Sequence, residues 1–343
     1  MSSPSSGPQR RRPTIADVAR RAGVSAAAVS FAVNDRPGVS PGTRERILTA
    51  ARDLGWQPSA SARALTEART RAVGLVMARS AGQLEGDSFF LRFLSGIEST
   101  LTAADYALLL QIVPFDAAMA LPAYERLAAA GRVDGFLLTD IEPRDPRFAL
   151  LAASAVPVVL AGRPAGPAPF PWLETRHDEG IAPAVEHLVS LGHARIAFFS
   201  GNAEFEHQRL RELAWRSSLA SAGLAPGPVA HVVHDQHAAA VSLLREQPDA
   251  IVCSSDALAF AVCAAARELG VSVPDDVSVV GFDDSALAAY STPALTSVRV
   301  DYTEFGAAAA SALLAAIAGD PPPAYSPSLP ELVVRDSTAL RRR

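Results

Sequence analysis

The chain has 343 residues, 49% of them hydrophobic, so it is long enough for two or three domains with cores of their own. No apolar run is long enough to cross a membrane, and the residues before Thr14 lack the apolar centre of a signal peptide. Two cysteines make no disulfide framework, which favours a cytoplasmic protein with reduced thiols.

Positive charge is concentrated at the amino-terminal end. Residues 1–71 carry twelve arginines and five acidic residues, a net charge of +7, whereas the remainder carries −12. A basic module joined to an acidic body is typical of proteins that bind the phosphates of nucleic acid. We expect residues 1–13 to form a flexible basic arm that precedes this module.

Two short helices separated by a glycine follow the arm. Apolar residues recur at helical spacing from Ile15 to Ala22, after Thr14 as a possible N-cap. Gly23 suits the left-handed turn that ends this helix, and Ser25 can cap the next. Helix-turn-helix pairs of this kind lay the second helix into the major groove of DNA.

The second helix presents an unusual exposed face. Ala26, Ala27, Ser30 and Phe31 share it, and an exposed phenylalanine among small residues argues against an ordinary three-helix bundle. A third helix is predicted at about 41–54. It is capped by Ser40, and its apolar stripe consists of Ile47, Leu48, Ala51 and Leu54.

From residue 71 onward, apolar strands alternate with helices. The strands are predicted at 72–78, 106–113, 134–139, 157–161, 195–200, 229–233, 250–254, 277–282, 297–300 and 331–335. The helices between them include 90–103, 180–191, 209–222 and 256–269. Buried strands that alternate with helices predict parallel sheets covered on both faces, and the repeat is long enough for two doubly wound lobes. Ligands of such sheets bind at the carboxyl ends of the strands.

The helices, together with Arg36-Pro37-Gly38-Val39-Ser40 and residues 56–65, resemble the lactose/galactose repressor family. Further marks of this family are the segments 187–197, 277–284 and 293–298. The resemblance covers nearly the whole chain. It implies an α/β protein with three parts: a helix-turn-helix DNA-binding domain over 14–57, a hinge helix and linker over 58–70, and an effector-binding and dimerisation domain over 71–343. The last part is a periplasmic-binding-protein-like core of two lobes, with crossovers near 162–174 and 285–293.

The resemblance also assigns DNA contacts. Ala26, Ala27 and Phe31 are placed at base-reading positions, where apolar side chains pack on thymine methyl groups and form no bidentate hydrogen bonds. Leu65 is placed where an apolar wedge opens a minor-groove step, so part of the specificity moves to the hinge and to DNA shape. The full set of expected DNA contacts is Thr14, Ser25, Ala26, Ala27, Ser30, Phe31, Asn34, Ala62, Arg63 and Leu65.

Effector contacts follow from the same resemblance. They fall on Phe89, Phe90, Arg163, His207, Arg211, Ser255, Asp256 and Asp283, with Gly162 as an alternative to Arg163. Aromatic rings beside Asp and Arg suit a sugar or sugar derivative. Because Gly162 stands where an acid is frequent in the family, a phosphorylated or otherwise anionic ligand held by Arg163, Arg176 and Arg211 is an alternative.

No catalytic constellation, cofactor motif or metal site is predicted. His231, His234 and His237 straddle a strand end and a helix start, so they point in different directions and favour a solvated loop over a metal site. We therefore expect a transcriptional regulator, most simply a repressor, that binds palindromic operator DNA and a small-molecule effector. A transporter's solute-binding protein is the alternative with the same core. Such a protein does not need a basic helical domain, so the amino-terminal helices argue against it. Because no heptad segment follows residues 331–335, a homodimer is expected rather than a tetramer.

Overall fold

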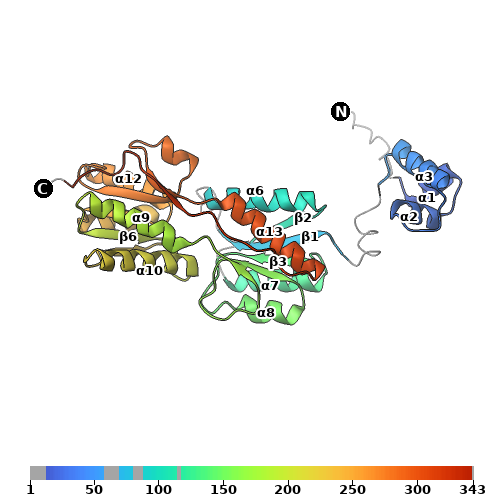
Figure 1. Ribbon diagram of the computed structural model, residues 1–343, viewed down its shortest axis with the longest axis horizontal. Coiled ribbons are helices and arrows are strands. Elements are labelled where there is room, and N and C mark those ends of the chain that lie inside the picture. The colour runs from blue at the N-terminus through green and yellow to red at the C-terminus, as the bar shows by residue number, and fades with distance from the viewer. Residues whose placement is uncertain (1–12, 58–68, 80–87, 114–116, 342–343) are drawn as a thin grey trace, which may run out of the picture. The chain divides into compact units, whose positions relative to one another are not determined.

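The computed structural model describes residues 13–57, 69–79, 88–113 and 117–341. The chain divides into two compact units, Met1–Thr70 and Arg71–Arg343 (Figure 1). The helices within the described ranges are all too short or too polar to span a membrane.

The first unit contains three helices, α1 (Ile15–Ala22), α2 (Ala26–Val33) and α3 (Pro41–Leu54). Val18, Val29 and Ile47 are fully buried at its centre, one from each helix. The prediction for Leu48 was wrong, because this side chain is 41% exposed. Residues 47, 50, 51 and 54 share one face at 100° per residue, and position 48 lies off that face.

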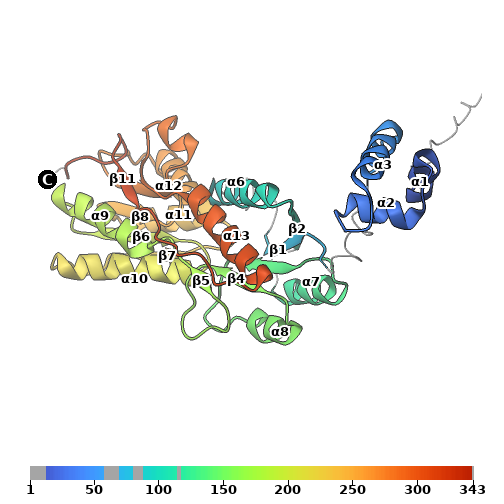
Figure 2. The same ribbon diagram turned by 45° about the vertical axis from the view of Figure 1, so that its right-hand side comes forward.

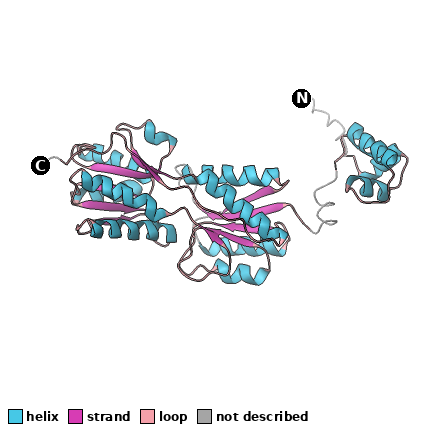
Figure 3. Cartoon of the chain, in the orientation of Figure 1, coloured by secondary structure: helices cyan, strands magenta, loops and turns pink. Residues whose placement is uncertain are grey.

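The second unit contains two open sheets, drawn in magenta in Figure 3. The first has the order β2-β1-β3-β4-β5, and all its strands are parallel. Its strands are β1 (Ala72–Ala78), β2 (Ala107–Val113), β3 (Gly135–Leu138), β4 (Val158–Ala161) and β5 (Trp172–Leu173). We call this sheet and its helices the first lobe.

The helices of the first lobe cover both faces of its sheet. α6 (Ser88–Ala103) and α13 (Tyr302–Ala318) share one core with the sheet. α7 (Ala117–Ala129) and α8 (Arg147–Ser154) lie on the opposite side, where a second core contains Tyr124 and Phe136 (Figure 2).

The second lobe contains the sheet of order β11-β10-β9-β8-β6-β7, which is parallel except for its edge pair β10–β11. Its strands are β6 (Ile196–Ser200), β7 (Val229–His231), β8 (Ala250–Cys253), β9 (Ser278–Asp283), β10 (Thr296–Arg299) and β11 (Glu331–Val333). α9 (His177–Ser190) and α10 (Glu206–Ser221) cover one face, and α11 (Gln236–Arg245) and α12 (Asp256–Leu269) cover the other. A 3₁₀ turn, η1 (Ala286–Ala289), follows β9.

These elements confirm the predicted fold class, and each predicted strand is present to within two residues at either end. The observed first crossover lies at the end of the predicted range 162–174, and the second crossover, predicted near 285–293, was misplaced. β5 extends the first sheet to residue 173, so the chain leaves the first lobe after that strand. β9 and β10 pair in parallel within the second sheet, so the chain stays in the second lobe over 285–293 and returns between β10 and α13.

α6 and α13 approach each other closely at two glycines. A Cβ atom at Gly96 would lie 2.0 Å from the carbonyl oxygen of Thr303, and one at Gly306 would lie 2.1 Å from that of Phe93. Real Cβ atoms do not tolerate such distances, so only glycine allows this helix contact. The contact fixes α13, which follows most of the second lobe in sequence, as a structural part of the first.

Candidate functional site

The start of α1 and the turn after it are fixed by local bonds. Asp17 accepts hydrogen bonds from the Thr14 backbone N–H at 2.9 Å and from the Thr14 hydroxyl at 2.7 Å. Gly23 has φ 66°, the left-handed conformation that lets the chain reverse. The Ser25 hydroxyl accepts from the Ala28 N–H at 3.2 Å and begins α2. These bonds place α2 as the second helix of a helix-turn-helix.

α2 presents the face that the sequence predicts. Ala26 and Ala27 are exposed, Phe31 is 40% exposed, and Ser30 is half-buried next to Asn34. A Cβ at Gly38 would lie 3.5 Å from the Phe31 ring, so the ring rests beside the backbone of the α2–α3 loop. The exposed face is apolar. The three expected hinge contacts, Ala62, Arg63 and Leu65, lie outside the described residues.

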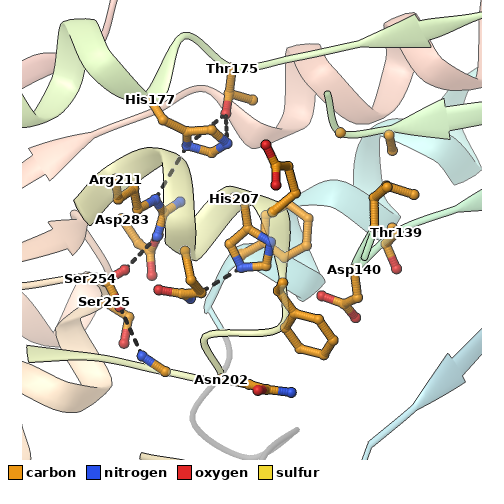
Figure 4. A pocket seen from close by; sticks show the side chains of 18 of the residues that line it. Thr139, Asp140, Thr175, His177, Asn202, His207, Arg211, Ser254, Ser255 and Asp283 are labelled. Atoms are coloured by element: carbon orange, nitrogen blue, oxygen red, sulfur yellow. Dashed lines mark hydrogen bonds between the residues drawn. The ribbon is translucent and has the colours of Figure 1, made fainter. Parts of the chain in front are cut away.

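A pocket of about 220 Å³ lies between the two lobes (Figure 4). Many of its lining residues lie at or just after the carboxyl ends of β1, β3, β4 and β5 in the first lobe and of β6, β7, β8 and β9 in the second. Phe89 on α6 and Tyr302 and Phe305 on α13 also line it. The volume is many times the ~10–15 Å³ that one water needs, so the pocket has room for a small organic molecule. The expectation that a ligand binds at the carboxyl ends of parallel strands therefore points to this pocket from both lobes.

Arg211 on α10 organises the floor of the pocket. Its side chain donates to the Ser254 carbonyl oxygen, to Nδ1 of His177 at 3.3 Å and to the Tyr302 hydroxyl at 3.3 Å. The guanidinium also lies 3.8 Å from the centre of the Phe282 ring, a cation–π contact. These partners come from four separate elements or loops, so the buried arginine fixes them relative to one another.

Tyr302 extends this network to the end of β9. Its hydroxyl donates to Oδ1 of Asp283 at 2.7 Å, and burial raises the tyrosine's pKa well above its ordinary value, which keeps it a donor. Asp283 has φ 108°, an unusual conformation for a residue with a side chain. Tyr302 also packs edge-to-face on Phe89 at 4.8 Å between ring centres.

Two histidines in the pocket are neutral at physiological pH. Burial, then the charge of Arg211, lowers the pKa of His207 to about 3. The same two causes, in the same order, hold the pKa of His177 well below its ordinary value. Neutral imidazoles offer one hydrogen-bond donor and one acceptor each, which suits the recognition of hydroxyl groups.

The structure places most of the predicted effector residues on the pocket walls and two of them elsewhere. Phe89, Arg163, His207, Arg211, Ser255 and Asp283 line the pocket. Phe90, at 5% exposure, packs in the first-lobe core, because neighbouring helical residues point about 100° apart. Asp256 accepts hydrogen bonds from the Ser297 hydroxyl at 2.5 Å and the Ser285 N–H at 2.6 Å, so it braces the second lobe. These two assignments are corrected accordingly.

The arginines proposed for an anion are already paired. Arg163 lies 3.9 Å from Glu174, and Arg211 is occupied as described above. Arg176 lies outside the pocket lining and contacts Glu179 at 2.8 Å. Four acidic residues, Asp140, Glu174, Glu206 and Asp283, line the pocket beside three arginines, Arg79, Arg163 and Arg211. This balance favours a neutral ligand over an anion.

Sequence reasoning missed several lining residues, among them Arg79, Asp140, His177 and Tyr302. Asp140 follows β3 by two residues, so the rule that ligands bind at the carboxyl ends of parallel strands, applied to this strand, would have found it. Tyr302 carried no such signal, because it reaches the pocket only through the return of α13 to the first lobe.

No group of three His, Cys, Asp or Glu side chains in the described part of the chain is arranged to hold a metal. The three histidines weighed in the sequence have separate surroundings. His231 lies 3.3 Å from Glu212, His237 lies 2.7 Å from Glu268, and His234 is exposed.

Two family models match the chain. The one described as bacterial regulatory proteins, lacI family, matches residues 14–59, and the one described as periplasmic binding protein-like domain matches residues 185–338. The transcriptional regulator MalR of Streptomyces coelicolor is 35% identical over 340 residues, which cover 95% of this chain and 96% of MalR.

Two solved structures share both the fold and part of the sequence. The transcriptional regulator CelR in complex with cellobiose is 29% identical with a TM-score of 0.69, and the match covers 95% of this chain and all of CelR. The Lac repressor dimer bound to operator and the anti-inducer ONPF is 26% identical with a TM-score of 0.81, and the match covers 96% of this chain and all of that chain.

Proposed function

Because the chain belongs to the lacI family of bacterial regulatory proteins, it is a DNA-binding transcriptional regulator and not an enzyme, and we propose that it is a repressor controlled by a neutral sugar or sugar derivative. The observation that carries this proposal is the interlobe pocket at the carboxyl ends of both sheets. Its aromatic rings, neutral histidines and balanced charges suit a polyhydroxylated ligand.

The ligand class follows from what the pocket offers. Phe89 and Phe205 supply apolar ring faces, against which the C–H face of a sugar packs. Asp283 and Asp140 supply carboxylate acceptors for hydroxyl groups. The binding of cellobiose by CelR, a protein similar to this chain over nearly its full length, supports a sugar in the same class.

On the DNA side, we propose that two copies bind a roughly palindromic operator with one α2 helix in each major groove. The similarity to the operator-bound Lac repressor dimer supports both the dimer and the operator. Ala26, Ala27 and Phe31 then pack on thymine methyl groups. The phosphates are contacted by Thr14, Ser25, Ser30 and Asn34. Such contacts position the helix and do not read the base sequence. Because the DNA of a bacterium lies in its cytoplasm, we propose that the protein works there.

The two sites are coupled through the lobes. A ligand that contacts both lobes favours one relative arrangement of them, and a differential affinity of a few kcal/mol is enough to change operator occupancy. Ala62, Arg63 and Leu65 of the proposed hinge are the residues through which the change reaches the DNA-binding helices.

The test combines DNA selection with ligand screening. Genomic fragments that the purified protein retains are sequenced to define an operator, and gel shifts on that operator are repeated with neutral sugars and sugar phosphates. We expect a near-palindromic site and a change in its affinity with at least one neutral sugar. We also expect the logarithm of the affinity to fall steeply with that of the salt concentration. Retention of no fragment above background contradicts the DNA-binding proposal, and an operator affinity that no ligand changes contradicts the effector proposal.

A further inference from the structure

The two lobes meet along one rim of the pocket, at a group of residues that we call the interlobe clasp. It consists of Arg79, Asp140 and Ile141 from the first lobe and Phe205, Glu206 and His207 from the second. The Glu206 N–H donates to the Ile141 carbonyl oxygen at 2.8 Å, and the Arg79 guanidinium lies 5.7 Å from the centre of the Phe205 ring. All six residues also line the pocket, so lobe contact and ligand contact share the same side chains.

Asp140 is held rigidly on the first-lobe side of the clasp. Its backbone has φ 51°, and its carbonyl oxygen accepts a 2.9 Å hydrogen bond from the largely buried Arg147. Oδ1 accepts from Arg79 Nη2 at 2.7 Å, while Oδ2 has no hydrogen-bond partner within the described ranges. Gly162, which directly follows the neighbouring strand β4, adds no side chain to this part of the wall. The clasp therefore presents one open carboxylate oxygen.

His207 faces the clasp from the second lobe, across the pocket from Asp140 (Figure 4). Its Nε2 lies 3.1 Å from Nε2 of Gln208, an amide nitrogen that can only donate. With the Gln208 amide in this orientation, Nε2 of the neutral ring is the acceptor and Nδ1 carries the proton. Oε1 of Gln208 is buried and has no partner among the described residues, so it adds a second open acceptor to this side.

A donor on one lobe thus stands opposite an acceptor on the other, and no hydrogen bond joins these two side chains within the described structure. We infer that a hydroxyl group of the effector bridges the lobes here, accepting from Nδ1–H of His207 and donating to Oδ2 of Asp140. The inference rests on the proposed function and makes Asp140 a specificity-determining residue for a neutral hydroxyl. A phosphate dianion has no proton to donate to Oδ2 and is repelled by the carboxylate, so this position favours a neutral hydroxyl over a phosphate.

The bridge also explains how the ligand would hold the lobes together. A hydroxyl can serve as donor and acceptor at once, so a single group satisfies one residue from each lobe. A ligand that makes such contacts only when the lobes are closed shifts the population toward closure. This bridge adds to the two contacts that the protein itself makes across the clasp. One joins Ile141 to Glu206, and the other joins Arg79 to Phe205.

The test replaces the open oxygen in two ways: Asp140→Asn keeps an oxygen acceptor for Arg79, whereas Asp140→Gly removes both carboxylate oxygens, the partner of Arg79 included. Asparagine and glycine both tolerate positive φ, so Asp140→Asn turns the acceptor into an N–H donor, and Asp140→Gly removes it. Glu204→Gln is the matched control, because it removes an exposed acid that lies outside the pocket lining. Each full-length protein is screened by thermal shift and titrated by calorimetry. The probes are glucose, cellobiose and other neutral mono- and disaccharides, their single-deoxy analogues, glucose 6-phosphate and AMP.

We expect the unaltered protein to bind at least one neutral sugar, and both Asp140 variants to bind it roughly 10- to 100-fold more weakly, the range for a hydrogen bond to a charged group. One deoxy analogue should weaken binding to the unaltered protein strongly and cause a smaller further loss in Asp140→Gly, where only the contact with His207 remains to be lost. The Glu204→Gln control should bind as the unaltered protein does.

Three results overturn the inference. Equal sugar affinity in the Asp140 variants would remove Asp140 from recognition while leaving the effector site in place. Preference of the unaltered protein for glucose 6-phosphate or AMP would contradict the neutral hydroxyl. No binding of any probe would contradict the proposed effector site itself, and the bridge with it.

Discussion

Arg92 on α6 donates a 2.7 Å hydrogen bond to the carbonyl oxygen of Asp284, and this bond joins the first lobe to the second. The same guanidinium donates at 3.0 Å to the carbonyl oxygen of Asp283. Both acceptor residues have positive φ, 108° at Asp283 and 47° at Asp284. The carboxylate of Asp284 is in turn held by Arg299 and Arg335, each at 2.7 Å. The loop that carries a pocket carboxylate is thus held from both lobes.

Replacing Arg92 tests the importance of this connection. We expect Arg92→Ala to lower the free energy of unfolding by about 1–3 kcal/mol, because it removes two hydrogen bonds from a charged donor. Urea denaturation of the full chain measures the loss. Arg126→Ala on α7, an exposed arginine, is the control and should change stability by less than about 0.5 kcal/mol. Equal losses in the two variants would mean that the bonds to the loop contribute nothing specific.

The close contact of α6 and α13 predicts a strong effect of one added methyl group. Gly306→Ala would place a Cβ 2.1 Å from the Phe93 carbonyl oxygen, so the helices must separate. We expect a loss of about 1–3 kcal/mol, the range for overpacking. Gly42→Ala in α3 is the counterpart, because no atom lies within 4 Å of the added group. It should stabilise the first unit by roughly 0.5–1 kcal/mol. Scanning calorimetry of both variants measures the two changes in stability. A Gly306→Ala variant as stable as the unaltered protein would contradict the described helix contact.

His207 predicts a pH-dependent stability. Its pKa of about 3 in the folded protein lies below the ~6.5 of an unfolded chain, so unfolding takes up a proton between these pH values. Its contribution to stability is therefore complete above about pH 6.5 and is lost as the pH falls, by up to about 1.4 kcal/mol per pH unit. His177 acts in the same direction.

Urea denaturation between pH 7.5 and 5 measures this dependence. The slope of unfolding free energy against pH should be shallower in His207→Gln than in the unaltered protein. His234→Gln, at an exposed histidine, should keep the original slope. An unchanged slope in His207→Gln would show that this imidazole takes up its proton equally in both states.

The apolar face of α2 predicts how the operator is read. Phe31→Ala should weaken operator binding by roughly tenfold, because it removes the largest apolar group on that face. Operators with uracil in place of individual thymines identify the methyl group involved. One such replacement should weaken binding of the unaltered protein but not of Phe31→Ala. Leu48→Ala, at an exposed leucine of α3, is the control, and equal losses at both positions would refute direct reading by Phe31.

Strand positions were predictable because buried parallel strands are continuous apolar runs. β1 and α12 match the predicted bounds, since each is delimited by polar or turn-forming residues. β5 was missed because its two residues, Trp172 and Leu173, form no run and lie in a segment rich in Pro and Gly. A strand this short is defined by its neighbour β4 and has no signal of its own.

The site was harder to predict than the fold, because adjacent residues take opposite roles. Phe89 lines the pocket and Phe90 the core, and Ser255 lines the pocket while Asp256 braces the loop beneath it. Sequence position identifies the strand end from which a side chain comes. The direction in which that side chain points depends on the local helix phase and on hydrogen bonds to residues far away in the chain.

The return of α13 to the first lobe determines the order in which the protein can mature on the ribosome. Residues 1–70 are made first and form a unit of their own. The first lobe, by contrast, needs Phe305, Ala309 and Leu313 to complete its core, and these residues are made only after most of the second lobe. Domains fold as units during synthesis, starting from the amino-terminal end. A growing chain therefore has a finished DNA-binding unit well before it has a pocket, so the earliest folded part of each molecule is the part that is not yet under ligand control.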